Sequence, residues 1–291
     1  MLHRSYVHSF GLTEHYVILL EQSLTINVLK AATAPFRSIP YMECVEFDPN
    51  LPVWFHIIDR ESGKRFVTDY VGEAFLMFHH INAYEKDGHI VIDLCAHKDH
   101  AVFSMLYTDV PRRAPEGAVL RASPRRYVVP LEVNSSGLQK ENVVRLPGMK
   151  ASAIIGDDGA VHLHHEDHVS RSFFCEFPRI NDRYVGKPYR YFYIVAEGSE
   201  ASLMKVDTEK KTFQTYSMEG WVATEPVFVA RPDASAEDDG VVLSTFLNNT
   251  QECMVTLVIL DGQSFEELTR TEFETPIVVP SSFHGWFHGA E

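Results

Sequence analysis

The residues of this chain best suited to chemistry are its histidines, of which there are 15 in 291 residues. A neutral imidazole binds divalent metals such as Fe(II), and near neutral pH it also serves as an acid or a base. A single histidine on a strand is nevertheless more often a structural residue than a ligand. The sequence contains neither an HExxH motif nor a paired Cys/His pattern, so it does not indicate zinc.

Three histidines share apolar surroundings although they lie far apart in the chain. His8 lies in "YVHSFG", His79 in "MFHHIN" and His284 in "SSFHGWF", and each follows an apolar residue near an expected strand end. Only a closed, radial fold would bring such distant strand ends together.

His79 and His80 are adjacent within "VGEAFLMFHHINAYEKDGHIVIDLC". Neighbouring side chains on a strand point to opposite faces. At most one histidine of this pair can therefore face a shared site.

The densest histidine cluster is "VHLHHEDH", which contains His162, His164, His165 and His168. His162 and His164 alternate onto one strand face, as a pair of metal ligands would. The segment follows the turn-forming "GDDGA" and is otherwise polar. We therefore expect the edge of a surface hairpin rather than a metal site.

The composition sets limits on fold and function. The chain is 45% hydrophobic and 12% aromatic, which suffices for a large core, and its net charge of −14 argues against unaided nucleic-acid binding. Four widely spaced cysteines without a CxxC pair indicate reduced thiols. There is no signal-peptide pattern and no apolar run long enough to span a membrane. We expect a cytoplasmic protein that is not secreted and that can lie peripheral to membranes.

Short runs rich in β-branched and aromatic residues dominate the chain and are separated by turn signals such as "KDG" and "DDG". They predict an all-β sandwich, barrel or propeller. Residues 201–217 read as a hairpin, and 255–274 as a second hairpin whose connection could form a helical turn. Residues 97–126, rich in proline and arginine, read as a long surface connection. The expected strands are 15–29, 53–60, 89–95, 125–133, 189–196, 225–230, 240–247 and 253–260.

Five motifs in order resemble the carotenoid cleavage oxygenase family, which includes the animal β-carotene oxygenases and the retinoid isomerohydrolase of the eye. They are "YVHSFGLTEHYVILLEQ", "FHHINAYEKDGHIVIDLC", "CEFPRIN…GKPYRYFY", "EPVFVARPDA…EDDGVVLS" and "FHGWF". The resemblance runs from residue 5 to residue 288. It implies an all-β, seven-bladed β-propeller and a single domain over residues 1–291, here incomplete because the N-terminal blades are missing.

The resemblance also implies an iron site. In the family, four histidines on the propeller axis hold one Fe(II), and glutamates accept hydrogen bonds from three of them. Carried over, the ligands are His8, His79 rather than His80, and His284 rather than His288, with Glu176 and Glu225 as carboxylate partners. Both glutamates have apolar flanks, and an unpaired buried carboxylate is costly, so a histidine partner is the economical interpretation.

The family's activity implies oxidative cleavage of a carotenoid double bond by O2, which gives apocarotenals such as retinal. Two alternatives stay open: a retinoid isomerohydrolase, and an iron-less propeller that binds a carotenoid or retinoid without activity. His97 stands where the isomerohydrolase has a tunnel tryptophan, which argues mildly against the first alternative. An interaction propeller that uses the "VHLHHEDH" edge ranks last.

Family chains are usually much longer than this one. The part before "YVHSFG" carries the remaining histidine ligand, the remaining glutamate and the first blades. We therefore expect this sequence to be the C-terminal portion of a longer protein. As an isolated polypeptide it would expose unpaired strand edges and be poorly stable and inactive.

A polyene substrate must leave a bilayer, so a membrane-facing patch is expected. Residues 26–42 lie where the family has part of that surface. Val28, Leu29 and Phe36 could enter lipid beside Lys30 and Arg37. The alternative is an ordinary strand followed by a loop.

Overall fold

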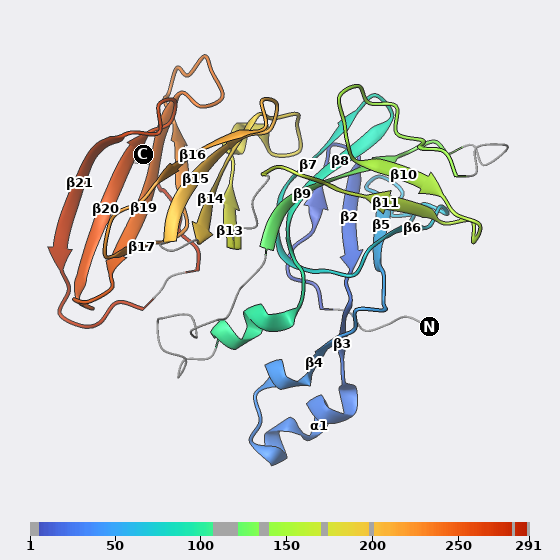
Figure 1. The fold of residues 1–291 in the computed structure, drawn as a ribbon, viewed down its shortest axis with the longest axis horizontal. Helices are drawn as coiled ribbons and strands as arrows, with labels where there is room; N and C mark the ends of the chain where they lie inside the picture. The colour runs from blue at the N-terminus through green and yellow to red at the C-terminus, as the bar shows by residue number, and fades with distance from the viewer. Residues whose placement is uncertain are drawn as a thin grey trace. The chain divides into compact units, whose positions relative to one another are not determined.

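The computed structural model describes residues 6–106, 122–133, 140–169, 174–197, 201–280 and 283–289 (Figure 1). These residues are nearly all in strands and connections, which confirms the predicted all-β class. The chain divides into two compact units, Met1–Asp167 and His168–Glu291, which are described separately below. The assignment of residues 1–291 to one propeller domain stays a prediction.

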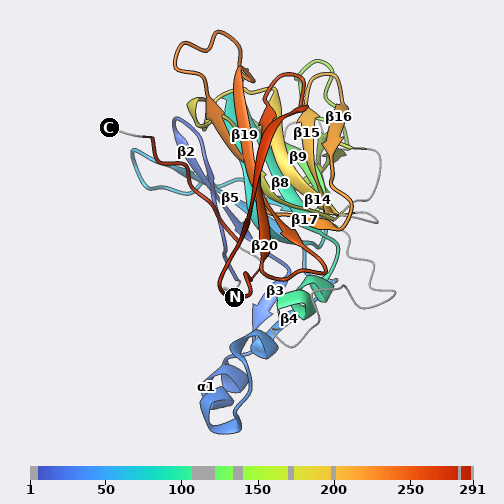
Figure 2. The ribbon, with the colours of Figure 1, turned by 90° about the vertical axis from the view of Figure 1, so that its left-hand side faces the viewer.

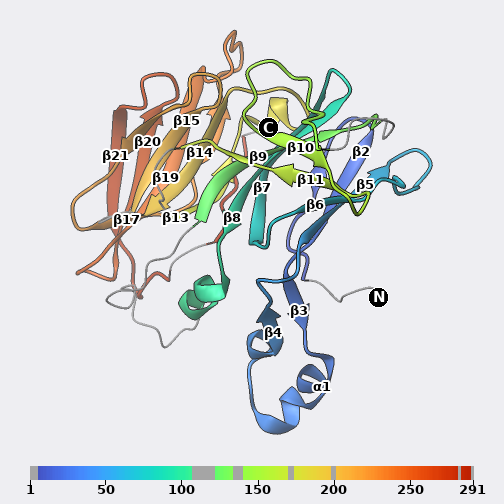
Figure 3. The ribbon, with the colours of Figure 1, turned by 45° about the vertical axis from the view of Figure 1, so that its right-hand side comes forward.

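The first unit contains a six-stranded sheet in the order β1-β2-β5-β6-β11-β10. All neighbours are antiparallel except β6 and β11, and Figure 3 shows β5, β6, β11 and β10 side by side. On β2, Ile18 and Leu20 are buried opposite Ile57 and Phe55 of β5, because alternate side chains share a face. The strands are β1 (Gly11–Leu12), β2 (Tyr16–Glu21), β5 (Val53–Asp59), β6 (Tyr70–Gly72), β11 (Val161–His164) and β10 (Ser152–Ile155).

The second sheet of this unit has the order β12-β9-β8-β7. Every residue of β8 is buried, as expected for the continuous apolar run that predicted it. The pairing of β7 with β8 shifts register on both sides of His80, which marks bulges in β7. The strands are β7 (Leu76–Lys86), β8 (His89–His97), β9 (Ala122–Pro130) and β12 (Glu166–Asp167), and η2 (His100–Leu106) follows β8.

An excursion leaves the sheets of the first unit between two short paired strands, β3 (Leu24–Ile26) and β4 (Val45–Phe47). It carries the helix α1 (Val28–Arg37) and η1 (Tyr41–Cys44), and Figure 2 shows α1 standing away from the sheets of its unit. The Asn27 side chain accepts a hydrogen bond from the Lys30 amide at 3.0 Å, which caps the helix. The alternative of a strand followed by a loop is therefore wrong.

The second unit contains two antiparallel sheets, β13-β14-β15-β16 and β17-β19-β20-β21, with β18 also paired to β19. Tyr193 stacks on Phe228 at 5.2 Å between ring centroids, and Val242, Phe246 and Val258 are fully buried in the same cluster. The elements are β13 (Phe174–Arg179), η3 (Asp182–Tyr184), β14 (Tyr191–Glu197), β15 (Ala201–Asp207), β16 (Thr212–Tyr216), β17 (Trp221–Ala223), β18 (Val227–Ala230), β19 (Gly240–Asn248), β20 (Met254–Asp261) and β21 (Glu267–Glu274).

Both predicted hairpins are confirmed, as β15–β16 and β20–β21. The connection of the second hairpin is a tight turn rather than a helical one. The Asp261 side chain accepts hydrogen bonds from the amides of Gln263 and Ser264, and Phe265 has a φ of +60°, so the chain reverses at once. The predicted surface connection 97–126 is too long, because its last five residues belong to the buried strand β9. Residues 107–121 lie outside the described part of the chain.

Candidate metal-binding residues

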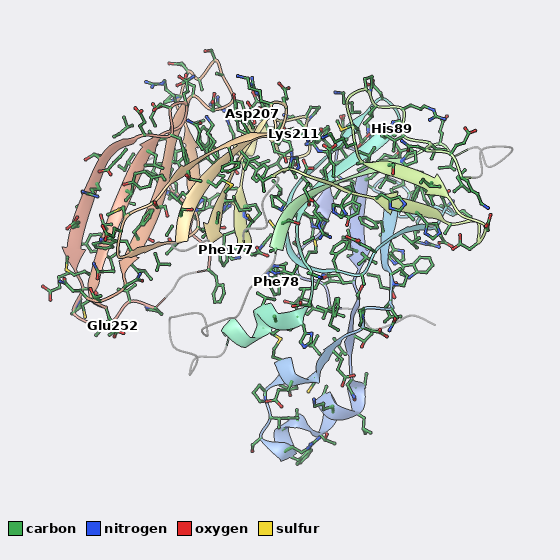
Figure 4. All side chains as sticks on the ribbon, in the orientation of Figure 1. Phe78, His89, Phe177, Asp207, Lys211 and Glu252 are labelled. Atoms are coloured by element: carbon green, nitrogen blue, oxygen red, sulfur yellow. The ribbon has the colours of Figure 1, made fainter. Side chains whose placement is uncertain are left out.

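His8 and His79 lie side by side within the first unit. His79 lies on β7, and His8 lies in the segment before β1, which runs beside β7. The two imidazole centroids are 5.0 Å apart with ring planes at 89°, and Phe78, labelled in Figure 4, packs 5.2 Å from the His8 ring. The Ser9 hydroxyl donates to the Phe78 carbonyl at 2.7 Å, which fixes this segment on β7. Two imidazoles from distant parts of the sequence therefore meet.

His8 is oriented by a phenol. The Oη atom of Tyr6 lies 2.7 Å from Nδ1 of His8. An imidazole binds a metal through a nitrogen without a proton. Metal binding through Nε2 therefore requires the tautomer in which Nδ1–H donates to the Tyr6 oxygen. Burial raises the pKa of Tyr6, which keeps its hydroxyl neutral.

His80 has different surroundings from those of His79. Its Nδ1 lies 3.0 Å from the Ser9 hydroxyl, and its backbone amide donates to the same oxygen at 3.1 Å. Burial lowers the pKa of His80 to about 3, with a further contribution from the charge of His79. His80 is thus a neutral structural residue beside β1, whereas His79 faces His8.

His284 has its carboxylate partner within the second unit. Its Nδ1 lies 2.9 Å from Oε1 of Glu225, whose side chain is only 3% exposed. An ionised carboxylate only accepts hydrogen bonds, so Nδ1 carries the proton and Nε2 presents the lone pair. The geometry prepares His284 to bind a metal through Nε2.

Glu225 is held by two more donors. The Gly285 amide donates to Oε2 at 2.7 Å, and Nη2 of Arg179 donates to the same oxygen at 3.1 Å. Nε of Arg179 lies 3.1 Å from Oε1 as an ion-pair contact. Each oxygen of this buried carboxylate therefore has two polar contacts.

Glu176 is buried in β13, where its Oε2 accepts a hydrogen bond from the Phe177 amide at 3.1 Å. The register between β13 and β14 shifts between Glu176 and Arg179, so a bulge follows the glutamate. Phe177, labelled in Figure 4, has a φ of +57° in this bulge, and its ring lies 6.0 Å from that of His284. The role of Glu176 as a partner of a ligand histidine stays a prediction.

The donor types fit Fe(II). Neutral imidazole suits this ion, and carboxylates that accept the far ring N–H orient such ligands. His8 and His79 lie in the first unit and His284 in the second, and both His8 and His284 have Nδ1 engaged within their own unit. Their binding to one ion stays a prediction.

The "VHLHHEDH" histidines do not form a candidate metal site. Among the described residues, no group of three metal-binding side chains includes them. Nε2 of His162 instead lies 3.1 Å from Asp158, and His165 lies beside Glu73 and Asp167. The expected hairpin is present, but β11 lies between β6 and β10, so the histidine strand is not the edge strand.

Reasoning from the sequence missed two residues at these sites. Arg179 lies within "CEFPRIN" and Tyr6 within "YVHSFG", so both belong to motifs that the sequence analysis had selected. Only the glutamate and the histidine of those motifs were predicted to have a role at the site. The signal was the presence of further polar side chains inside the same short motifs.

Comparisons with known proteins point to one family. The family model described as retinal pigment epithelial membrane protein matches residues 2–289. The mitochondrial carotenoid-cleaving dioxygenase of Pongo abelii is 35% identical over 97% of this chain and 53% of its own length. The β,β-carotene 15,15'-dioxygenase of Mus musculus is 34% identical over 99% of this chain and 51% of its own length.

Solved structures agree with these sequence matches. A variant of the Synechocystis apocarotenoid oxygenase matches with a TM-score of 0.74 and 26% identity, over 97% of this chain and 53% of that one. A cobalt-substituted form of the Synechocystis enzyme matches with a TM-score of 0.73 and 26% identity, over 97% of this chain and 53% of the other. The chain thus spans about half the length of the curated relatives it matches.

Proposed function

Because this chain belongs to the family of the retinal pigment epithelial membrane protein and the carotenoid-cleaving dioxygenases, we propose that it forms part of an iron-dependent oxygenase. The reaction is the oxidative cleavage of a carotenoid double bond by O2, which gives apocarotenals such as retinal. The fold is a β-propeller of the carotenoid oxygenase type, with seven blades in the whole protein. The observation that carries the proposal is the buried Glu225 that orients Nε2 of His284 for a metal.

Each candidate residue has a defined task in this proposal. His8, His79 and His284 would hold one Fe(II) as neutral imidazoles, and the ion would supply the redox chemistry that the reaction with O2 needs. Glu225 fixes the tautomer of His284, and Glu176 does the same for another ligand. Tyr6 orients His8 through its 2.7 Å contact with Nδ1.

The test is an activity assay of the full-length protein loaded with Fe(II), with β,β-carotene in detergent micelles as the probe. O2 uptake and aldehyde products are measured together. We expect both in the wild type, neither in His79→Ala, and wild-type rates in the control His162→Ala, whose imidazole pairs with Asp158. Equal activity of His79→Ala and wild type would refute the ligand assignment. Retinol release from a retinyl ester without O2 uptake would favour the isomerohydrolase.

We also propose that α1 contacts the membrane from which the substrate is taken. No helix among the described residues has the length and apolarity to cross a bilayer, and α1 itself has 10 residues. Leu29 is 78% exposed and Phe36 90%, and the two lie seven residues apart on one helix face together with Val28. Lys30 and Arg37 provide positive charge beside them for anionic headgroups. The protein's cellular location stays a prediction.

A further inference from the structure

We infer that Arg179 is a positioning residue for His284, because its guanidinium joins the carboxylate partner of that histidine to the backbone of the next residue. The inference rests on the proposed function, in which His284 binds the metal. It gives a role to a residue of the second unit that lies within "CEFPRIN" but is not among the proposed ligands and their glutamate partners. Arg179, Glu225 and Gly285 form a closed set of contacts with one another.

Arg179 binds two acceptors at once. Its Nη2 donates to Oε2 of Glu225 at 3.1 Å and to the Gly285 carbonyl at 2.6 Å, while Nε lies 3.1 Å from Oε1. The Gly285 amide donates to Oε2 of Glu225 at 2.7 Å. Both backbone polar groups of Gly285 are therefore held, its amide by the glutamate and its carbonyl by the arginine.

The His284 segment depends on these bonds for its conformation. The described residues 283–289 belong to no helix or strand, and their side chains are exposed. A ladder of backbone hydrogen bonds is therefore lacking in this described segment. The Glu225 and Arg179 side chains provide the substitute, and they fix both the ring of His284 and the backbone that carries it.

The bulge in β13 places Arg179. Glu176 pairs with Val195 and Arg179 with Tyr193, so three steps on β13 match two steps on β14. Partner residues share a face of a sheet, and Val195 and Tyr193 share a face because they are two residues apart. The extra residue therefore puts Arg179 on the same face of the sheet as Glu176, which it would otherwise leave. Pro178, which donates no backbone hydrogen bond, suits this position.

An arginine suits this task better than a lysine. The guanidinium is a rigid, planar fork with several donors, so it reaches a carboxylate and a carbonyl in fixed directions. It also lies 6.0 Å from the Trp286 ring centroid. The Arg179 side chain is 24% exposed and the Glu225 side chain 3%, so the pair is largely shielded from water. A lysine would keep the charge but only one of the directed contacts.

The test is Co(II) binding to the full-length protein after the removal of iron, with Co(II) as the probe. The variants are Arg179→Gln, Arg179→Lys, the matched control Arg183→Gln, and His284→Ala. Arg183 lies on η3 and donates to the Pro232 carbonyl at 3.3 Å, so its removal changes the charge without touching Glu225. Loss of an outer residue of a metal site typically weakens affinity about 10-fold or more, and we expect that for Arg179→Gln.

The visible absorption of bound Co(II) distinguishes a role of Arg179 in orienting His284 from a role in stabilising the fold alone. We expect altered band positions in Arg179→Gln, an intermediate spectrum in Arg179→Lys and a wild-type spectrum in Arg183→Gln. A merely structural arginine would lower the melting temperature but leave the bands of bound Co(II) unchanged. If Arg179→Gln does not fold, Arg179→Lys decides, and wild-type affinity and bands in that variant would overturn the inference.

His284→Ala distinguishes this inference from the proposed function. If His284→Ala binds Co(II) as the wild type does, the ligand assignment itself is wrong. If His284→Ala loses Co(II) while Arg179→Gln matches Arg183→Gln in affinity and spectrum, the ligand assignment stands and the role of Arg179 fails.

Discussion

Replacement of Glu225 by alanine should destabilise the protein even without a metal. The Glu225 side chain is 3% exposed and contacts Arg179, His284 and the Gly285 amide. Glu225→Ala removes the acceptor for all three and leaves a guanidinium without its carboxylate. The free energy of unfolding therefore falls for an electrostatic reason as well as through lost packing.

The exposure of the partners sets the magnitude. Breaking a fully buried ion pair by removal of one partner costs about 3–5 kcal/mol. Arg179 is 24% and His284 53% exposed, so water can reach both donors once the carboxylate is gone. We therefore expect a loss of about 2–3 kcal/mol in the free energy of unfolding for Glu225→Ala. Glu225→Gln keeps one acceptor oxygen and should cost about 1–2 kcal/mol.

Urea unfolding of the full-length protein in a metal chelator, followed by circular dichroism, measures this loss. The matched control is Glu219→Ala, because Glu219 is exposed and lies close in sequence. We expect the control to stay within about 0.5 kcal/mol of the wild type. Equal stabilities of Glu225→Ala and Glu219→Ala would refute the interpretation of Glu225 as the buried centre of this network.

Three further predictions concern α1, β7 and the core. In co-sedimentation with anionic vesicles, the double variant Leu29→Glu/Phe36→Glu should no longer bind. The control Val67→Glu changes a residue that is 93% exposed but lies outside α1, and it should bind as the wild type does. Equal binding of the double variant and the control would count against a membrane-contacting helix. His79→Ala should lose bound iron, whereas His80→Ala should retain iron but unfold at lower urea, because His80 is buried against Ser9; the reverse pattern would exchange their roles. Phe246→Ala should cost about 3–5 kcal/mol in urea unfolding, because its ring is fully buried, and a cost below about 1 kcal/mol would contradict the described core.

The positions of many strands along the chain were predictable from the sequence because the signals are local. β8 reads as a continuous apolar run and is buried throughout, and the polar tip of residues 201–217 marks the β15–β16 turn. α1 was missed although Asn27 is a standard helix cap and alanines follow it. Pro35 and the strand-like residues before the helix indicated a strand and a loop instead. The packing that stabilises a helix in the folded protein is not visible in such local sequence patterns.

The candidate site was only partly predictable. The resemblance selected His284 and Glu225, and the structure places their nitrogen and oxygen 2.9 Å apart. Arg179 escaped because its role depends on a bulge, and a one-residue register shift leaves no periodic trace in the sequence. The number of blades and the shared iron stay predictions, since they depend on how distant parts of the whole protein assemble.

Iron content tests the central claim most directly. The full-length protein, its His79→Ala/His284→Ala double variant and the control His162→Ala are purified in parallel, and iron per chain is measured by elemental analysis. We expect one iron per chain in the wild type and the control, and almost none in the double variant. Full iron occupancy in the double variant would contradict it.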